Sequence, residues 1–357
     1  MKFYDAMQLG ANSLKPLIKE AKDEKEKKKY IWALIIKNIL CIMFCVLVVT
    51  PFGKIFGDEN SIVGVVTVMA LLTFRFSNLD FDVVQSTTAL FSIFIIFCIS
   101  PQIATMANPI LGFFINFISI MAIVVLSCHN TILCNQSILV LSYILLYGNP
   151  VGDIKQYKDR VIALIVGGII VSTIFYIKHR DEKFHRKFKD IISDFDFSNE
   201  RTKWQVKLVL GVTLMIFIGE LIKLPRVMWI GFSVLSIIQP NKEKLEVRFK
   251  TRYLYIILGS LICGITYVVM PIELRGLMGI LGGILAGYSA TYKWQTTFNC
   301  FGAIAVAVPI FGLKGAIIVR IFDNIIGAIY SSFFDKTFNY LDNRIDNNND
   351  NAMSEVG

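Results

Sequence analysis

Residues 31–49 read IWALIIKNILCIMFCVLVV and contain one charged side chain, that of Lys37. An α-helix crosses a hydrocarbon layer of ~30 Å with ~20 predominantly apolar residues. The stretch therefore predicts a transmembrane helix. Because lipid offers no hydrogen-bond partners, the backbone must satisfy its own polar groups, so any further spans are expected to be helical as well.

The composition extends this prediction to the whole chain. Hydrophobic residues make up 55% of the 357 residues and charged residues only 18%, whereas soluble domains carry roughly 25% charged residues. The net charge is +9, and the basic residues lie in short runs between apolar stretches. This pattern indicates anionic lipid headgroups as partners and argues against nucleic acid.

Twelve apolar stretches predict an all-α polytopic membrane protein with about 12 transmembrane helices. They are residues 31–49, 61–73, 83–99, 109–125, 131–147, 160–177, 204–222, 226–239, 253–270, 274–288, 294–311 and 315–334. With the N-terminus inside the cell, the inner segments hold 25 Lys and Arg residues and the outer segments hold 7. The positive-inside rule thus favours an even number of spans with both termini cytoplasmic.

The spans form two groups of six with matching charged residues. The first span of each group carries a lysine near its start, Lys37 or Lys207, and the last carries an arginine, Arg160 or Arg320, with a glycine seven positions later. An even number of spans gives both groups the same orientation, which predicts two parallel six-helix repeats. The expected domains are a cytoplasmic N-terminal segment (1–29), the first repeat (30–178), a cytoplasmic linker (179–202), the second repeat (203–336) and a disordered cytoplasmic tail (337–357).

Short motifs in the second half resemble a known family. They are Trp229-Ile230-Gly231-Phe232 leading to Gln239-Pro240, then Arg248-x3-Arg252-x6-Gly259-x4-Gly264, and finally Arg320-x2-Asp323-x3-Gly327. This pattern is similar to the fusaric acid resistance (FUSC) family of aromatic acid exporters. The resemblance implies secondary export of small organic anions, aromatic carboxylates among them, across the plasma (inner) membrane of a bacterium. It also implies a periplasmic adaptor protein and a homo-oligomer as partners to test.

Five ionisable residues inside spans are the candidate site residues. Lys37, Lys207, Arg160 and Arg320 are candidates for substrate binding, because an anion that leaves water needs compensating positive charge. Asp323 lies three residues after Arg320 and is the candidate for proton coupling. The alternatives are structural: the lysines would snorkel to headgroups, Arg160 would lie at the interface, and Arg320 and Asp323 would form a neutralised pair.

No motif indicates an enzyme, a cofactor or a metal. The sequence has no phosphate-binding loop, and its seven cysteines and three histidines show no ligand spacing. Gly279, Gly283 and Gly287 lie four apart and predict a face for close helix packing. Two other functions remain open: an anion channel like the plant malate channels of the wider superfamily, and a non-transport envelope or scaffold protein.

Overall fold

The computed structural model describes the backbone of residues 1–356, and their side chains except those of 242–244, 343 and 345–356. Over this part of the chain the regular elements are α-helices and short 3-10 helices. The chain divides into two compact units. Unit 1 comprises Met1–Pro51 and Val247–Ile325, and unit 2 comprises Phe52–Glu246 and the chain from Ile326 onward.

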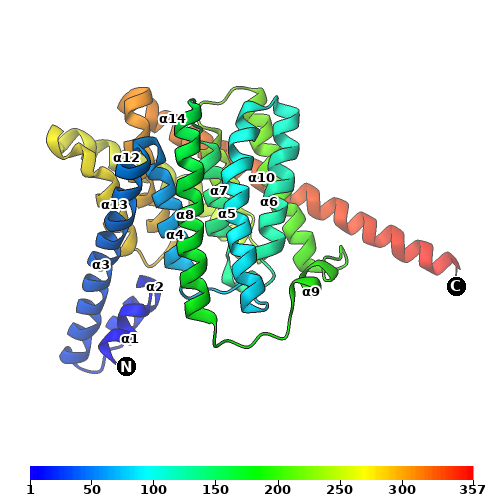
Figure 1. Cartoon of the computed structure of the whole chain (residues 1–357), viewed down its shortest axis with the longest axis horizontal. Helices are drawn as coiled ribbons and strands as arrows, with labels where there is room; N and C mark the ends of the chain where they lie inside the picture. Colours follow the sequence, from blue (N-terminus) through cyan, green and yellow to red (C-terminus); the bar gives the residue numbers. More distant parts are fainter. Residues whose placement is uncertain (357) are drawn as a thin grey trace. The chain divides into compact units, whose positions relative to one another are not determined.

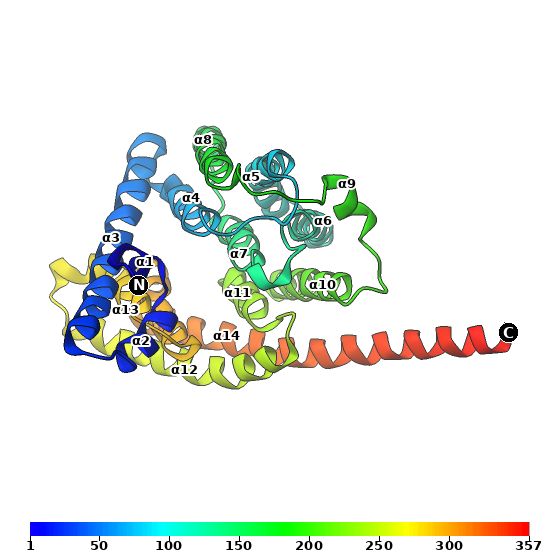
Figure 2. The same cartoon turned by 90° about the horizontal axis from the view of Figure 1, so that it is seen from below.

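Unit 2 is a helical bundle. Its helices are α4 (Ser61–Phe74), α5 (Val83–Met106), α6 (Pro109–Ser127), α7 (Gln136–Tyr147), α8 (Ile154–His179), α9 (Phe188–Ser193), α10 (Glu200–Leu221) and α11 (Val227–Ile237). Helices α5, α6, α8 and α10 stand upright in Figure 1 and are seen close to end-on in Figure 2. The short helix α7 contacts α4, α5, α6 and α11, so it lies in the interior of this bundle.

Local sequence sets where these helices begin. The side chain of Asp82 accepts a hydrogen bond of 3.0 Å from the Gln85 amide at the start of α5, and Asn108 accepts one of 2.9 Å from the Leu111 amide at the start of α6. Aspartate and asparagine are preferred at this position because they satisfy amides that have no partner within the helix. Pro109 follows Asn108 at the first helical position, where a proline costs nothing.

Unit 1 combines the N-terminal helices with helices from the second half of the chain. Its elements are α1 (Phe3–Gln8), α2 (Ala11–Lys19), most of α3 (Glu24–Phe56), most of α12 (Lys242–Val269), the 3-10 helix η3 (Ile272–Leu277), α13 (Met278–Gly287) and the first part of α14 (Tyr292–Val356). Gly312 interrupts α14 with a φ of 66°, a conformation that glycine adopts without steric cost. The stretches 294–311 and 315–334 are thus two helices, as the sequence predicts, separated by the non-helical backbone of Gly312 within the element labelled α14.

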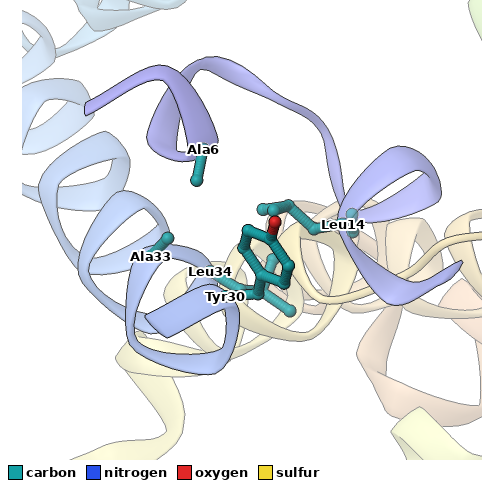
Figure 3. Close-up of a cluster of buried hydrophobic side chains, with 6 residues drawn as sticks. Ala6, Leu14, Tyr30, Ala33 and Leu34 are labelled. Carbon is teal, nitrogen blue, oxygen red and sulfur yellow. The ribbon is translucent and has the colours of Figure 1, made fainter. Parts of the chain in front are cut away.

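The N-terminal helices pack on α3. Ala6, Leu14 and Tyr30 bury their side chains together with Ala33 and Leu34, and their side chains meet in one cluster in Figure 3. The cluster fixes α1 and α2 on the polar end of α3. The predicted cytoplasmic segment 1–29 is therefore folded against the first apolar helix.

Among the described residues, seven helices are long and apolar enough to cross a membrane: α3, α5, α6, α8, α10, α12 and α14. The four other apolar helices α4, α7, α11 and α13 have 10 to 14 residues, which at 1.5 Å per residue is shorter than a hydrocarbon layer of ~30 Å. Each of the twelve apolar stretches is helical. The count of twelve full spans and the two parallel repeats stay predictions.

One packing relationship recurs in the two units. In unit 1, α3 contacts α13 where Asn38 Nδ2 donates a 2.9 Å hydrogen bond to the Ile284 carbonyl. In unit 2, α10 packs along α6. In each case the first helix of one predicted repeat contacts the fourth helix of the other.

Helix α14 extends to Val356, and contacts with α10 at Asp335, Asn339 and Asp342 hold the part up to Asp342. The disordered tail expected at 337–357 stays a prediction, and residue 357 lies outside the described residues. The predicted glycine face on α13 is confirmed at Gly287, where a Cβ would lie 2.7 Å from Asn38 Cγ on α3, but a Cβ at Gly279 or Gly283 would meet open space. Gly282 makes a further close contact, since its Cβ would lie 2.6 Å from Phe301 Cβ.

Candidate functional site

Lys207 lies in the interior of unit 2 and has a carboxylate partner. Its Nζ is 2.6 Å from Asp335 Oδ1, and their side chains are only 9% and 13% exposed. Asn339 Oδ1 accepts a second hydrogen bond from the ammonium at 3.2 Å, and the Phe338 ring centroid is 5.9 Å away. The sequence singled out Lys207 but not Asp335, which lies 128 positions later at the end of the last apolar stretch.

A cavity of about 260 Å³ lies beside this pair. It is lined by Thr131, Glu200, Arg201, Lys203, Trp204, Lys207, Gln239, Pro240, Phe338, Asn339 and Asp342. Lys203 forms a 3.0 Å ion pair with Asp342 at its edge. The Gln239-Pro240 turn of the family-like motif is thus part of the wall next to Lys207. We call this space the Lys207 cavity.

Arg160 is buried in unit 2 and fully engaged in hydrogen bonds. Its Nε donates to Asn60 Oδ1 at 2.9 Å, Nη1 to the Asn149 carbonyl at 2.5 Å, and Nη2 to the Glu59 carbonyl at 2.9 Å. These bonds join α8 to the segment before α4 and to the end of α7. The geometry is that of a structural cross-link, and Arg160 is not among the residues lining the Lys207 cavity.

Lys37 lies on α3 in unit 1. Its Nζ donates a 2.6 Å hydrogen bond to the Leu9 carbonyl, between α1 and α2. The ammonium is therefore held toward the N-terminal segment. The sequence predicts matching roles for Lys37 and Lys207, and the structure gives them different partners: a backbone carbonyl for Lys37 and a carboxylate for Lys207.

Arg320 and Asp323 lie on the buried side of α14 in unit 1, 5% and 0% exposed. No hydrogen bond from a described residue reaches either carboxylate oxygen of Asp323. The sequence predicts that Arg320 and Asp323 pair on one helix face, and the structure does not bring them into hydrogen-bond contact. A buried carboxylate without a donor is costly when ionised, so Asp323 is an unusual group for this position.

The same part of unit 1 contains a polar cluster that the sequence analysis missed. Arg252 on α12 donates to Asn324 Oδ1 at 2.8 Å and to the Tyr292 hydroxyl at 3.0 Å, both on α14. Asn324 in turn donates to the Arg320 carbonyl at 2.8 Å. The signal for Asn324 was present: it stands four residues after Arg320 in an apolar helix, and so shares its face.

Buried cations outnumber carboxylates in the described part of each unit, where the largely buried Asp335 adds to the fully buried Asp323. Among side chains that the structure describes, the buried cations are Arg160, Lys207, Arg252 and Arg320, and the buried carboxylate is Asp323. Arg252 was seen in the sequence only as part of the basic segment after Gln239-Pro240. In the described part of the chain no group of three His, Cys, Asp or Glu side chains is arranged to hold a metal ion.

A second cavity, of about 350 Å³, lies at the other end of α10 from Lys207. Its wall contains Glu220 and Arg226, and the Tyr147 hydroxyl donates a 3.0 Å hydrogen bond to Glu220 Oε1. Glu220 was not among the candidate residues of the sequence. Only the fold brings it together with Tyr147, because the two lie 73 positions apart.

Residues 214–334 match a family model described as fusaric acid resistance protein-like. The match runs from α10 into α14 and includes Arg252, Arg320 and Asp323, so it confirms the resemblance drawn from the motifs of the second half. Searches of curated proteins and of solved structures each found no match. The seven long apolar helices and this similarity together describe a multi-pass membrane protein.

Proposed function

We propose that the protein exports small organic anions across the plasma (inner) membrane of a bacterium by secondary transport. The family similarity supports membrane transport or resistance as the general function, and it favours aromatic carboxylates as cargo. The protein would act without chemistry on the cargo and without a cofactor.

The excess of buried positive charge is the observation that carries the proposal. Each unit holds two buried cations, Arg160 and Lys207 or Arg252 and Arg320, against one buried or largely buried carboxylate, Asp335 or Asp323, among the side chains described. This excess would attract anions and repel cations. An ionisable residue at membrane depth is costly, and compensation for a charged solute is a reason to retain it. A merely structural role is best supported for Arg160, which three hydrogen bonds already satisfy.

The Lys207 cavity would receive the anion on the cytoplasmic side. An entering carboxylate would compete with Asp335 for the Lys207 ammonium, because both are hydrogen-bond acceptors of the same charge. Binding would then loosen the contact between α10 and the end of α14. Lys37 would serve the same purpose in the first repeat after its bond to the Leu9 carbonyl opens.

Asp323 would couple the movement to protons. Its carboxyl group is buried near Arg320 on the same helix and has no hydrogen-bond donor among described residues. When protonated, Asp323 would leave the Arg320 guanidinium available to the anion. When ionised, the Asp323 carboxylate would compete with the anion for that guanidinium. The remaining expected partners are anionic lipids along the basic segments, a second copy of the chain, and a periplasmic adaptor.

Efflux from proteoliposomes tests the proposal. Purified protein is reconstituted with internal radiolabelled benzoate, and release is followed with and without an imposed proton gradient. We expect gradient-dependent release that is reduced at least tenfold in Lys207→Gln. Lys155→Gln, which removes an exposed lysine of unit 2, is the matched control and should release benzoate at the wild-type rate.

The variant Asp323→Asn tests proton coupling in the same assay. It should still release benzoate, but the rate of release should no longer depend on pH. Release in the wild type that only follows the benzoate gradient, and is unaffected by protons, would indicate the channel. The absence of any flux of benzoate or malate, with correctly inserted protein, would refute transport and leave the scaffold function.

A further inference from the structure

The cavity at the Glu220 end of α10 differs in chemistry from the Lys207 cavity. It lies within unit 2 and is lined by Ala104, Thr105, Ala107, Pro109, Gly112, Phe113, Asn116, Tyr147, Gly148, Pro150, Ile216, Phe217, Glu220, Leu224, Pro225, Arg226, Val227 and Met228. Its volume of about 350 Å³ lies at the lower end of the range of small-molecule sites. We call it the Glu220–Arg226 cavity.

One carboxylate contributes to its wall. Glu220 Oε1 accepts a hydrogen bond from the hydroxyl of the buried Tyr147, which fixes the orientation of the carboxylate. Glu220 forms no ion pair with a described basic residue. Its second oxygen is therefore able to accept a hydrogen bond from a ligand.

One guanidinium faces the same space. Arg226 Nη1 is 3.5 Å from the Gly148 carbonyl, which is a weak contact, and the guanidinium lies 5.7 Å from the Trp229 ring centroid. The Nε atom is buried without a hydrogen-bond partner. A buried donor without an acceptor costs free energy, and an anionic ligand would offset this cost.

The two charges do not neutralise each other. Glu220 and Arg226 line one cavity, yet no ion pair or hydrogen bond joins them. A simple anion would be attracted by Arg226 and repelled by Glu220. A simple cation would be attracted by Glu220 and repelled by Arg226. Only a ligand with both charges is complementary to both residues.

The rest of the wall fits an apolar body. Phe113 and Phe217 lie with their ring centroids 5.6 Å apart, and both line the cavity. Two aromatic rings beside two fixed opposite charges are typical of a site that orients a small amphiphilic molecule.

We propose that the Glu220–Arg226 cavity binds a zwitterion, with its primary ammonium at Glu220, its oxyanion at Arg226 and its apolar part against Phe113 and Phe217. A free amino acid and the headgroup of an ethanolamine phospholipid share this chemistry. This cavity is separate from the Lys207 cavity of the proposed anion transport. Ligand binding to it is measured directly, without a transport assay.

Binding to the purified full-length protein tests the inference. The probes are L-phenylalanine, 3-phenylpropionate, which lacks the ammonium, and phenethylamine, which lacks the carboxylate. For the lipid, nanodiscs with phosphatidylethanolamine are compared with nanodiscs in which phosphatidylcholine replaces it, because a quaternary ammonium has no N–H to donate. The measurements are equilibrium binding of the radiolabelled probes and the melting temperature in each nanodisc.

The expected result is that L-phenylalanine binds at least tenfold more tightly than either single-charge analogue, or that phosphatidylethanolamine raises the melting temperature relative to phosphatidylcholine. Glu220→Gln and Arg226→Gln should each abolish the difference. Lys223→Gln is the matched control, since Lys223 is an exposed cation between the two residues in sequence and does not line the cavity.

Arg226→Lys keeps the positive charge and should retain part of the binding, so the test stands even where Arg226→Gln fails to fold. If phenylalanine binding requires both Glu220 and Arg226, the ligand is a free zwitterion. If only the effect of phosphatidylethanolamine on the melting temperature requires them, the ligand is the lipid headgroup. The proposal would be overturned if 3-phenylpropionate and L-phenylalanine bind equally and the two phospholipids also give the same melting temperature. It would also be overturned if wild type and both glutamine variants behave identically with every probe.

Discussion

Lys207 and Asp335 form an ion pair of 2.6 Å between α10 and α14, with both side chains largely buried. The pair joins the first helix of the second predicted repeat to the end of its last helix. It also lies beside the cavity that contains the Gln239-Pro240 turn. The best candidate for an anion contact is therefore occupied by a carboxylate of the protein itself.

Removing one partner of this pair should destabilise the protein more than removing both. Lys207→Gln leaves a carboxylate that is buried without its cation, which costs on the order of 3 kcal/mol. The double variant with Asp335→Asn should recover about half of that loss. Melting temperatures in detergent measure the coupling, with Lys203→Gln at the more exposed Lys203–Asp342 pair as the control with a smaller effect. Additive losses would contradict the prediction.

Arg160→Gln should lower stability and leave transport per molecule unchanged. The substitution removes three hydrogen bonds to Asn60, Asn149 and Glu59, and each unsatisfied partner costs roughly 1 kcal/mol or more. Membrane abundance and benzoate efflux per inserted molecule separate the two effects. A normal melting temperature with reduced efflux would instead assign Arg160 to the anion path.

Gly259→Ala should be strongly destabilising, and Gly279→Ala should not. A Cβ at Gly259 would lie 2.7 Å from Thr297 Cα and overlap the backbone there, which cannot move aside as a flexible side chain could. We expect a cost of roughly 2 kcal/mol or more, typical of overpacking. A Cβ at Gly279 meets open space. Similar melting temperatures for the two variants would show that α12 and α14 are not in close contact.

The stability of the protein should fall in mild acid because of His129, which lies between α6 and α7. Burial lowers the pKa of His129 below its usual 6.5, and the nearby Arg201 guanidinium lowers it further, whereas Asp194 at 3.7 Å opposes the shift. Below about pH 6.5 the unfolded chain takes up a proton that the folded protein resists, so stability is lost as the pH falls from 6.5 toward the folded pKa. Above pH 6.5 the group has no effect.

Melting temperatures between pH 8 and pH 5 measure this contribution. The wild type should lose more stability over this range than His129→Gln, which cannot be protonated. The same slope in both proteins would place the acid sensitivity elsewhere.

The orientation in the membrane is tested with single cysteines in a cysteine-free background. A cysteine at Ser198 should react only with a membrane-permeant reagent, because the linker 179–202 is predicted to be cytoplasmic. A cysteine at Gly152, where a Cβ meets open space, should react from outside in intact cells. The reverse pattern would invert the topology.

The sequence by itself determined the class of fold and the approximate position of every apolar helix. In the hydrocarbon layer, backbone N–H and C=O groups must form hydrogen bonds within the protein. A long apolar stretch therefore forms a helix whatever its tertiary contacts are. It also determined the similarity of the second half to the fusaric acid resistance family. Lys207, Arg320 and Asp323, which the sequence singled out inside apolar stretches, are buried in the structure, and their functional roles stay predictions.

Only the tertiary structure decided which partners these residues have. Asp335 reaches Lys207, and Asn324 reaches Arg252, from positions far along the chain. The glycine prediction on α13 holds at Gly287, which packs against Asn38, and fails at Gly279 and Gly283 for a related reason. Helical spacing shows which residues share a face, but the neighbouring helix decides which face is packed, and Phe301 packs at Gly282. Periodicity is a local property, whereas the choice of partner depends on contacts between distant segments.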